Sequence, residues 1–160
     1  MLVLVIKYIR DNRSPIPKNE TVSRVMSANK EKNTGPELTV RRALWRNGIR
    51  GYRLHSKKVI GKPDVAFIGK KIAVFIHGCF WHRCPYCKLP LPKSNPEYWK
   101  LKFERNIGRD KRNLRILKSN GWKVVIIWEC EIKHSLDKVV GRISKAAILV
   151  EILKSDCYSD

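Results

Sequence analysis

The stretch "WKVVIIWEC", residues 122–130, limits the possible folds of this chain more than any other feature. It is a nearly continuous apolar run, rich in β-branched residues, and such runs are typical of strands that are buried on both faces. Strands of that kind lie inside α/β sheets, between layers of helices. We therefore predict an α/β fold in which residues 122–130 form a central strand.

The remaining patterns place helices and strands around this run. Thr34 and Glu37 stand in the relation of a capping box, which predicts a helix that the Asn-Gly pair at 47 and 48 ends. A tight turn at Gly69 and Lys70 would join two of the expected strands as a hairpin. Further elements are strands at 51–55, 62–68 and 71–77, and helices at about 99–120, capped by Gly121, and at 136–154. This order predicts an α/β sandwich with a mixed sheet.

The length of 160 residues suits one compact domain, which we assign to residues 31–160. Residues 1–30 show no sustained period, and the prolines of "NRSPIPKNETVSR" predict an extended arm that becomes ordered on binding. The apolar start, "MLVLVI", spans about six residues with no small-residue cleavage site after it. We therefore expect neither a signal peptide nor a membrane span, and we expect a cytoplasmic location.

The charge of the chain is strongly unbalanced. Thirty-four Lys and Arg face fourteen Asp and Glu, which gives a formal net charge of +20. Such an excess attracts polyanions and releases their counterions, so nucleic acid is the first partner to consider. An anionic membrane surface or simple solubility are the alternatives, but no basic amphipathic segment or lipidation signal supports a membrane.

Cysteines form the strongest cluster of candidate ligands. Three of the five cysteines fall within nine positions, and in a reducing compartment they indicate metal binding rather than disulfides. Four thiolates suit a closed tetrahedral zinc site. His82 is a rival fourth ligand, and buried free cysteines are the alternative to a metal site. The candidate ligands are Cys79, Cys84, Cys87 and Cys130, whereas Cys157 is expected to belong to no site.

Asp64 and His77 are candidates for a second site. Asp64 begins one expected strand and His77 ends the next, so the hairpin would bring both to one edge of the sheet. A carboxylate and an imidazole placed there can hold a divalent ion or activate water for attack on a phosphodiester. The alternative is that "KPD" is a turn and Asp64 its cap.

Aromatic residues cluster around the cysteines. Phe80 and Trp81 lie inside the cysteine-rich loop, and Trp99 follows the next loop. Core packing is the default role for such side chains. On a chain with this charge, adjacent aromatics on a tethered loop also suit a wedge between base pairs, with Lys and Arg residues contacting the phosphates.

Five stretches together carry a family resemblance: "NTGPELTVRRAL", "GKPDVAF", "VFIHGCFWHRC", "SNPEYW" and "RDKRNLRILKSNGWKVVIIWEC". With these the chain resembles the very short patch repair (Vsr) endonucleases, the T:G mismatch nicking enzymes that accompany cytosine-5 methyltransferases. The resemblance extends from about Ser23 to Cys130. It implies a restriction-endonuclease-like core, in which a mixed sheet is flanked by helices and a structural zinc site.

The resemblance also implies an activity and its residues. The family nicks one strand beside the mismatch by magnesium-dependent hydrolysis, and its metal-binding aspartate corresponds to Asp64. Its active-site histidines correspond to His77 and His82, and its N-terminal helix glutamate corresponds to Glu37. Ile76 stands where the family can have a threonine, so it fits the magnesium site only if its main-chain carbonyl is the ligand.

The zinc ligands implied by the resemblance are Cys79, Cys84, Cys87 and Cys130. Where familiar members have a histidine, this chain has Cys84, and the spacing to Cys87 is longer by one. Since cysteine is an equally good zinc ligand, we expect a four-thiolate site that leaves His82 free for catalysis. The family's intercalating aromatics correspond to Phe80, Trp81 and Trp99, with Met26 as a partner from the opposite groove.

The resemblance finally implies a setting. The expected partner is double-stranded DNA with a T:G mismatch, bound by a monomeric, DNA-associated bacterial protein, and mismatch-repair proteins are further candidate partners. Two alternatives stay open: a zinc-stapled DNA-binding module that does not cleave, and a related nuclease with a different target.

Overall fold

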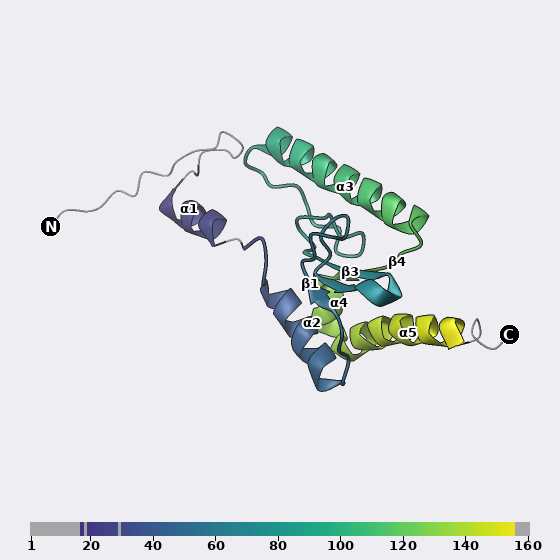
Figure 1. Cartoon of the computed structure of the whole chain (residues 1–160). Helices are drawn as coiled ribbons and strands as arrows, with labels where there is room; N and C mark the ends of the chain where they lie inside the picture. Colours follow the sequence, from purple (N-terminus) through teal and green to yellow (C-terminus); the bar gives the residue numbers. More distant parts are fainter. Residues whose placement is uncertain (1–16, 18, 29, 156–160) are drawn as a thin grey trace.

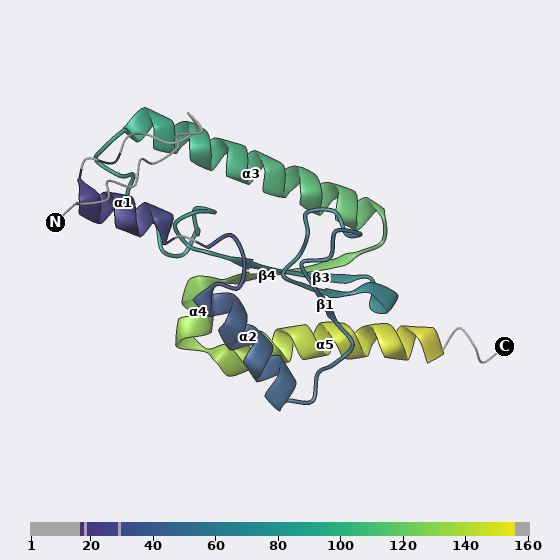
Figure 2. The same ribbon diagram turned by 60° about the vertical axis from the view of Figure 1, so that its left-hand side comes forward.

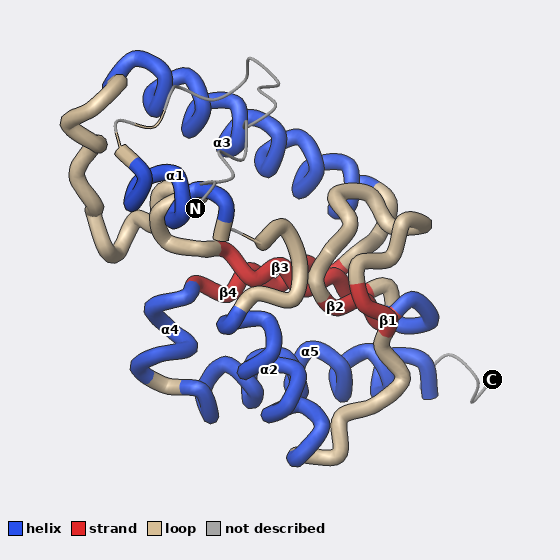
Figure 3. Tube along the Cα trace, turned by 90° about the vertical axis from the view of Figure 1, so that its left-hand side faces the viewer, coloured by secondary structure: helices blue, strands red, loops and turns tan. Residues whose placement is uncertain are grey.

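The structure is a computed structural model that describes residues 17, 19–28 and 30–155. In this part of the chain a four-stranded sheet lies between two layers of helices, as Figures 1 and 2 show. The long helix α3 (Pro96–Ser119) covers one face. Figure 3 shows α2 (Gly35–Arg46), α4 (Glu129–His134) and α5 (Leu136–Ser155) on the other face. The predicted mixed sheet flanked by helices is confirmed.

The sheet has the strand order β1-β2-β3-β4. Its first three strands are antiparallel neighbours, and β3 and β4 are parallel. The predicted hairpin of β2 and β3 is present, and its turn is the 3₁₀ helix η1 (Ile68–Lys70), which Lys71 closes in the left-handed region with a φ of 50°. The strands are β1 (Arg53–Leu54), β2 (Val65–Phe67), β3 (Ile72–His77) and β4 (Lys123–Trp128).

The prediction that residues 122–130 form a central strand is wrong in its position. The strand is β4, and it lies at one edge of the described sheet, where it pairs with β3 alone. Its apolar residues are still needed on both faces, because α5 covers one face and α3 the other. Arg142 protects the edge, since its Nη2 donates to the Ile126 carbonyl at 2.8 Å. The strand ends at Trp128, so Cys130 lies in α4.

The larger core lies between the sheet and the layer of α2 and α5. It consists mainly of aliphatic side chains from both layers, among them Val40, Leu44, Val65, Val74, Ile127 and Ile143. The core beneath α3 is smaller, and its buried members are Val59, Ala66, Ala73 and Leu117. Alanines at the centre of this face let α3 and the loop before β2 come close to the sheet.

The helix boundaries follow the local signals. Helix α2 begins after Thr34, and Glu37 accepts hydrogen bonds from the Asn33 N–H at 3.0 Å and the Thr34 N–H at 3.4 Å, as in the predicted capping box. Helix α3 begins three residues earlier than expected, because Pro96 is favoured in a first turn. The residue that caps its end is Asn120, and Gly121 follows it with a φ of 75°.

The expectation of an extended N-terminal arm is wrong for part of it. Residues Glu20–Ser27 form helix α1, in which Glu20 and Arg24 are an ion pair at 3.4 Å, one turn apart. The sequence predicted no helix here, because an eight-residue segment is too short to show a sustained apolar period. Residues 1–16 lie outside the described part. No helix among the described residues is long and apolar enough to cross a membrane.

Candidate active site and metal centre

An open cleft of about 930 Å³ lies where β3 ends, and α2, α3 and the loops around β1 and β2 supply its walls. Four lysines and one arginine line it, among them Lys62, Lys102 and Arg109. Six of its acidic and imidazole residues form two groups of three, Glu37 with His55 and Asp64, and His77 with His82 and Asp110. The cleft therefore joins a basic lining, suited to a phosphate backbone, with acid and imidazole groups.

Asp64 lies immediately before β2 and points at the neighbouring strand. Its Oδ2 accepts a hydrogen bond from the Ile76 N–H at 2.7 Å, so it is more than the cap of a local turn. The N–H and C=O of one strand residue face the same neighbour, which puts the Ile76 carbonyl on this side as well. A carboxylate beside a main-chain carbonyl is a donor set that fits a hard divalent cation.

The electrostatics of Asp64 support such a fit. Burial raises the pKa of the carboxyl to about 6; the hydrogen bond from Ile76 lowers it and the nearby Glu37 charge raises it. A bound cation would favour the ionised carboxylate that burial disfavours. Asp64 is therefore placed as a cation ligand would be.

Glu37 is buried in the first turn of α2, and its two oxygens have different neighbours. Oε1 accepts a hydrogen bond from the Thr34 hydroxyl at 2.8 Å, as part of the helix cap. Oε2 lies 3.2 Å from Nε2 of His55, inside the cleft. The predicted position of Glu37 thus serves the helix cap and also faces the cleft.

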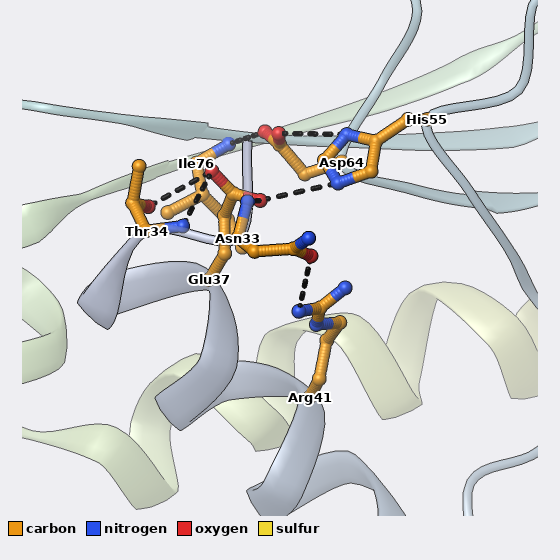
Figure 4. Close-up of polar contacts among 7 residues, drawn as sticks. All are labelled: Asn33, Thr34, Glu37, Arg41, His55, Asp64 and Ile76. Atoms are coloured by element: carbon orange, nitrogen blue, oxygen red, sulfur yellow. Dashed lines mark hydrogen bonds and ion pairs between the residues drawn. The ribbon is translucent and has the colours of Figure 1, made fainter. Parts of the chain in front are cut away.

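His55 was missed by the sequence reasoning. Strand β1 pairs with β2 so that Leu54 faces Val65, and one further step sets His55 opposite Asp64. Figure 4 shows the His55 ring facing the carboxylates of Glu37 and Asp64, with Nδ1 at 3.7 Å from Asp64 Oδ1. A histidine at the end of one strand and an aspartate at the start of the next was the available signal.

His77 and His82 lie face to face at the opening of the cysteine-rich loop. His77 is the last residue of β3, and the two rings stack with centroids 3.9 Å apart and 9° between their planes. Burial, together with the neighbouring His82, lowers the pKa of His77 to about 4. His77 is therefore neutral near pH 7, and the stacked pair avoids carrying two positive charges.

Asp110 of α3 completes this second group. Its Oδ2 lies 2.5 Å from Nδ1 of His82. Burial raises the pKa of Asp110, but the hydrogen bond and charge of His82 outweigh it and lower that pKa below its usual value. An ionised carboxylate on Nδ1 orients the ring and leaves Nε2 as the nitrogen that can take up a proton.

Asp110 could have been found from the helical period. It lies seven positions after the buried Phe103 and seven before the buried Leu117, so it faces the sheet. The basic residues around it in "GRDKRN" hid this position. An acid on the inner face of a basic helix was the signal.

The four predicted cysteines lie together. Their sulfur atoms are all within 4.8 Å of one another, and those of Cys84 and Cys130 are 3.7 Å apart. Cys79 follows β3 and Cys130 follows β4, so the parallel pairing of these strands brings the two together. Burial raises the pKa of the Cys79 thiol, so a thiolate there requires a cation.

The donor set of this sulfur cluster, Cys79, Cys84, Cys87 and Cys130, fits tetrahedral zinc. All four thiols are free of disulfides. His82 lies in the other group, beside Asp110, and so does not complete the cluster. Cys157 lies outside the described residues.

The aromatic residues of the loop form a half-buried cluster with α3. The Phe80 ring lies 5.2 Å, between centroids, from Trp81, Trp99 and Phe103 alike. Trp81 lines the cleft, and its carbonyl accepts a hydrogen bond from Asn106 at 3.0 Å. The aromatics thus pack on one another while staying partly accessible. Met26 belongs to α1, but its side chain is outside the description.

Comparisons with known proteins agree on one kind of enzyme. The family model described as DNA mismatch endonuclease Vsr matches residues 15–88. The Type II nicking enzyme V.XorIIP of Xanthomonas oryzae is 42% identical over 123 residues, which cover 76% of this chain and 86% of that protein. V.NmeAIP of Neisseria meningitidis is 44% identical over 103 residues, 64% of this chain and 73% of its own length. The DNA mismatch endonuclease Vsr of Escherichia coli is 31% identical over 113 residues, 71% of this chain and 72% of that enzyme.

Proposed function

Because the chain belongs to the Vsr family of DNA mismatch endonucleases, we propose that it nicks one strand of duplex DNA beside a T:G mismatch. At the coarser level the chain is a DNA endonuclease, and hence a hydrolase. The mismatch preference, the magnesium dependence and the roles of single residues are the proposed part. The following paragraphs derive them from the residues of the cleft.

One observation carries the proposal: a cation-type donor set and an oriented imidazole share the cleft. Asp64 and the Ile76 main chain form one group in it, and the His82–Asp110 pair forms another. Hydrolysis of a phosphodiester needs charge neutralisation at the phosphate and a base for the attacking water. The two groups would offer one of these each.

Asp64 and the Ile76 carbonyl would hold a divalent ion, Mg²⁺ in this proposal. When bound, the ion supplies Lewis-acid polarisation of the scissile phosphate. His82 takes the proton of the attacking water on Nε2, while Asp110 holds the ring through Nδ1 and stabilises the positive charge that develops. His77, neutral and stacked on His82, and Glu37 hydrogen-bond to water in the cleft.

The sulfur cluster is proposed to hold a structural zinc ion. The loop from Cys79 to Cys87 contains no helix or strand. Of its side chains, only those of Cys79 and Cys84 are buried. An ion bound by four thiolates would fix this loop, and with it the positions of His82 and the aromatic residues.

The mismatch preference is proposed to come from the aromatic residues of the loop. T:G wobble pairs stack and pair less well than Watson–Crick pairs, so opening the helix there costs less. Phe80, Trp81 and Trp99 would act as a wedge between base pairs, with Met26 entering from the opposite groove. Basic residues along the cleft, among them Arg109, would contact phosphates without reading sequence.

A nicking assay tests the proposal. We expect the wild-type chain, with Mg²⁺, to nick a T:G duplex and to leave the matched duplex largely intact. Asp64→Ala should abolish nicking, whereas the matched control Asp137→Ala, at an exposed acid of α5, should not. Wild-type binding without any nicking would favour a non-cleaving DNA-binding module. Equal cutting of the matched duplex would point to a related nuclease with a different target.

The partners of this activity are proposed on the same basis. The chain is expected to act as a monomer, and mismatch-repair proteins would take over the nicked product. Sedimentation of the chain alone and with a T:G duplex would test the first point, since a second copy in the complex would contradict it.

A further inference from the structure

His55 combines a strained backbone with a buried, unused nitrogen. Its φ is 45°, in the left-handed region that residues other than glycine seldom adopt. Such conformations persist where the surrounding structure fixes them, and they concentrate at functional sites. The strain keeps the ring at the end of β1, opposite Asp64.

The nitrogen in question is Nε2. Among the described residues it has no hydrogen-bond partner, although it is fully buried. Glu37 Oε2 lies 3.2 Å away, close enough for an ion pair, but its direction does not make a hydrogen bond. A buried imidazole nitrogen without a partner is costly, and a bound cation is one way to satisfy it.

The surroundings of Nε2 suit a cation. Glu37, His55 and Asp64 each offer one donor atom, and these atoms lie within 4.8 Å of one another. Two of the three donors are carboxylates, which supply the negative charge that a divalent ion requires. The Ile76 main chain, bonded to Asp64, adds a carbonyl on the same side.

We propose that His55 is a direct ligand of the divalent ion, beside Asp64, and that it tilts the site from Mg²⁺ towards Mn²⁺. This inference rests on the proposed function, because it concerns the cation of the same cleft. Mg²⁺ prefers a shell made of oxygen alone, whereas transition-metal ions accept an imidazole nitrogen readily. A nitrogen ligand therefore favours Mn²⁺ over Mg²⁺ at this place.

Electron spin-echo spectroscopy of bound Mn²⁺ tests the proposal without any cleavage. The probe is Mn²⁺ alone, added to the zinc-loaded full chain in the absence of DNA. A directly bound imidazole modulates the echo through its ¹⁴N nucleus. We expect this modulation in the wild type and in His134→Gln, a control at an exposed histidine of α4, and we expect its loss in His55→Gln.

Binding titrations give the second readout. His55→Gln should weaken Mn²⁺ binding about tenfold or more and Mg²⁺ binding about threefold or less, because only Mn²⁺ gains from the nitrogen. Absence of the modulation in the wild type would overturn the proposal, even if no His55 variant folds. Its retention in His55→Gln with loss in His77→Gln would overturn it as well.

The outcome is separable from that of the proposed function. A wild-type chain that nicks the T:G duplex but shows no nitrogen on Mn²⁺ would remove His55 from the ligand set and leave the nuclease proposal intact. A chain that shows the nitrogen but never nicks would keep the ligand and refute the nuclease.

Discussion

The sulfur cluster and the cleft both begin at the end of β3, yet their candidate ligand atoms are arranged differently. In the sulfur cluster the donor atoms lie within 4.8 Å of one another, and the Cys130 N–H donates to Cys79 Sγ. In the cleft the donors lie along an open wall, next to basic residues and to space for a substrate. The difference indicates that one cation would stabilise the fold, while the other would serve a reaction.

The ionised carboxylate of Asp64 weakens the metal-free fold. The pKa of Asp64 is about 6 in the folded chain and 3.8 as an ordinary value, so the folded state binds more protons between these pH values. The contribution of Asp64 to stability without the divalent ion therefore falls as pH rises from about 3.8 to about 6. The sulfur cluster should show the reverse, since protons compete with zinc and binding strengthens as pH rises.

Removing a thiolate should have the largest effect on stability. Cys84→Ser or Cys130→Ser takes one ligand from a site whose whole ion can contribute on the order of 10 kcal/mol. We expect loss of zinc, at least about 3 kcal/mol less stability and a Tm lower by roughly 10 °C, measured by metal analysis and calorimetry. Cys157→Ser is the matched control and should retain zinc. Loss of zinc on His82→Ala, with retention on Cys84→Ser, would reverse our division between structure and catalysis.

Asp64→Asn should separate activity from stability. Nicking should fall by a factor of about 10³ or more, because the cation-type donor set is lost. Above pH 6 and without added Mg²⁺, the variant should be more stable than the wild type by about 1–2 kcal/mol, since the neutral amide removes a buried charge. Thermal unfolding in Mg²⁺-free buffer measures this gain. No chelator is added, because a chelator would also remove zinc. A variant that is less stable at every pH would contradict the comparison.

The pH dependence of stability that His77 contributes is opposite in sign to that of Asp64. Its pKa is about 4 in the folded chain and 6.5 as an ordinary value, so the unfolded state binds more protons between them. Its contribution is complete above pH 6.5 and is lost as pH falls towards 4. We expect the acid-side slope of stability between these values to decrease in His77→Gln, measured by denaturant unfolding at stepped pH.

Asp110→Asn should reduce the rate of nicking and leave both metal contents unchanged. The amide can still hold His82, but it cannot stabilise the charged ring, so we expect kcat to fall about 10²-fold. Binding to a T:G duplex, measured by fluorescence anisotropy, should stay within about twofold. A loss of binding equal to the loss of rate would show that Asp110 supports the fold and not the base.

The smallest effect is expected at the helix cap beside the cleft. Thr34→Ala removes the hydroxyl that bonds Glu37 and should cost about 1 kcal/mol of stability, measured by denaturant unfolding. Thr34→Ser keeps a hydroxyl and should lose much less. If Thr34→Ala lowers nicking more than tenfold, the role of Glu37 in the helix cap is not independent of its role in the cleft.

Local patterns predicted the elements whose signals are local. The capping box, the hairpin and the closing helix depend on residues within a few positions, and so does the cysteine spacing. The edge position of β4 was not predictable, because an apolar run reports that both faces are covered and says nothing about pairing. Helix α1 was missed because its apolar positions span little more than one turn, which is too short a period to stand out in the sequence.

The residues of the candidate site also divide into those that local patterns predicted and those that they did not. Residues inside recognisable motifs, such as Asp64 and His82, were found from the sequence and lie in the cleft. His55 and Asp110 were missed because their positions depend on strand register and on which side of α3 faces the sheet. These are properties of pairing and packing between distant segments, which no short motif contains.

The sequence separation of 51 positions from Cys79 to Cys130 also affects the order in which the chain can assemble. The parallel strands β3 and β4 must find each other across α3, and closing such a long loop is entropically costly before any contact compensates. Zinc bound by thiolates just beyond both strands would shorten that search by holding their ends together. Refolding with zinc present from the start should therefore be faster than refolding with zinc added late, so that metal supply governs how fast active protein forms.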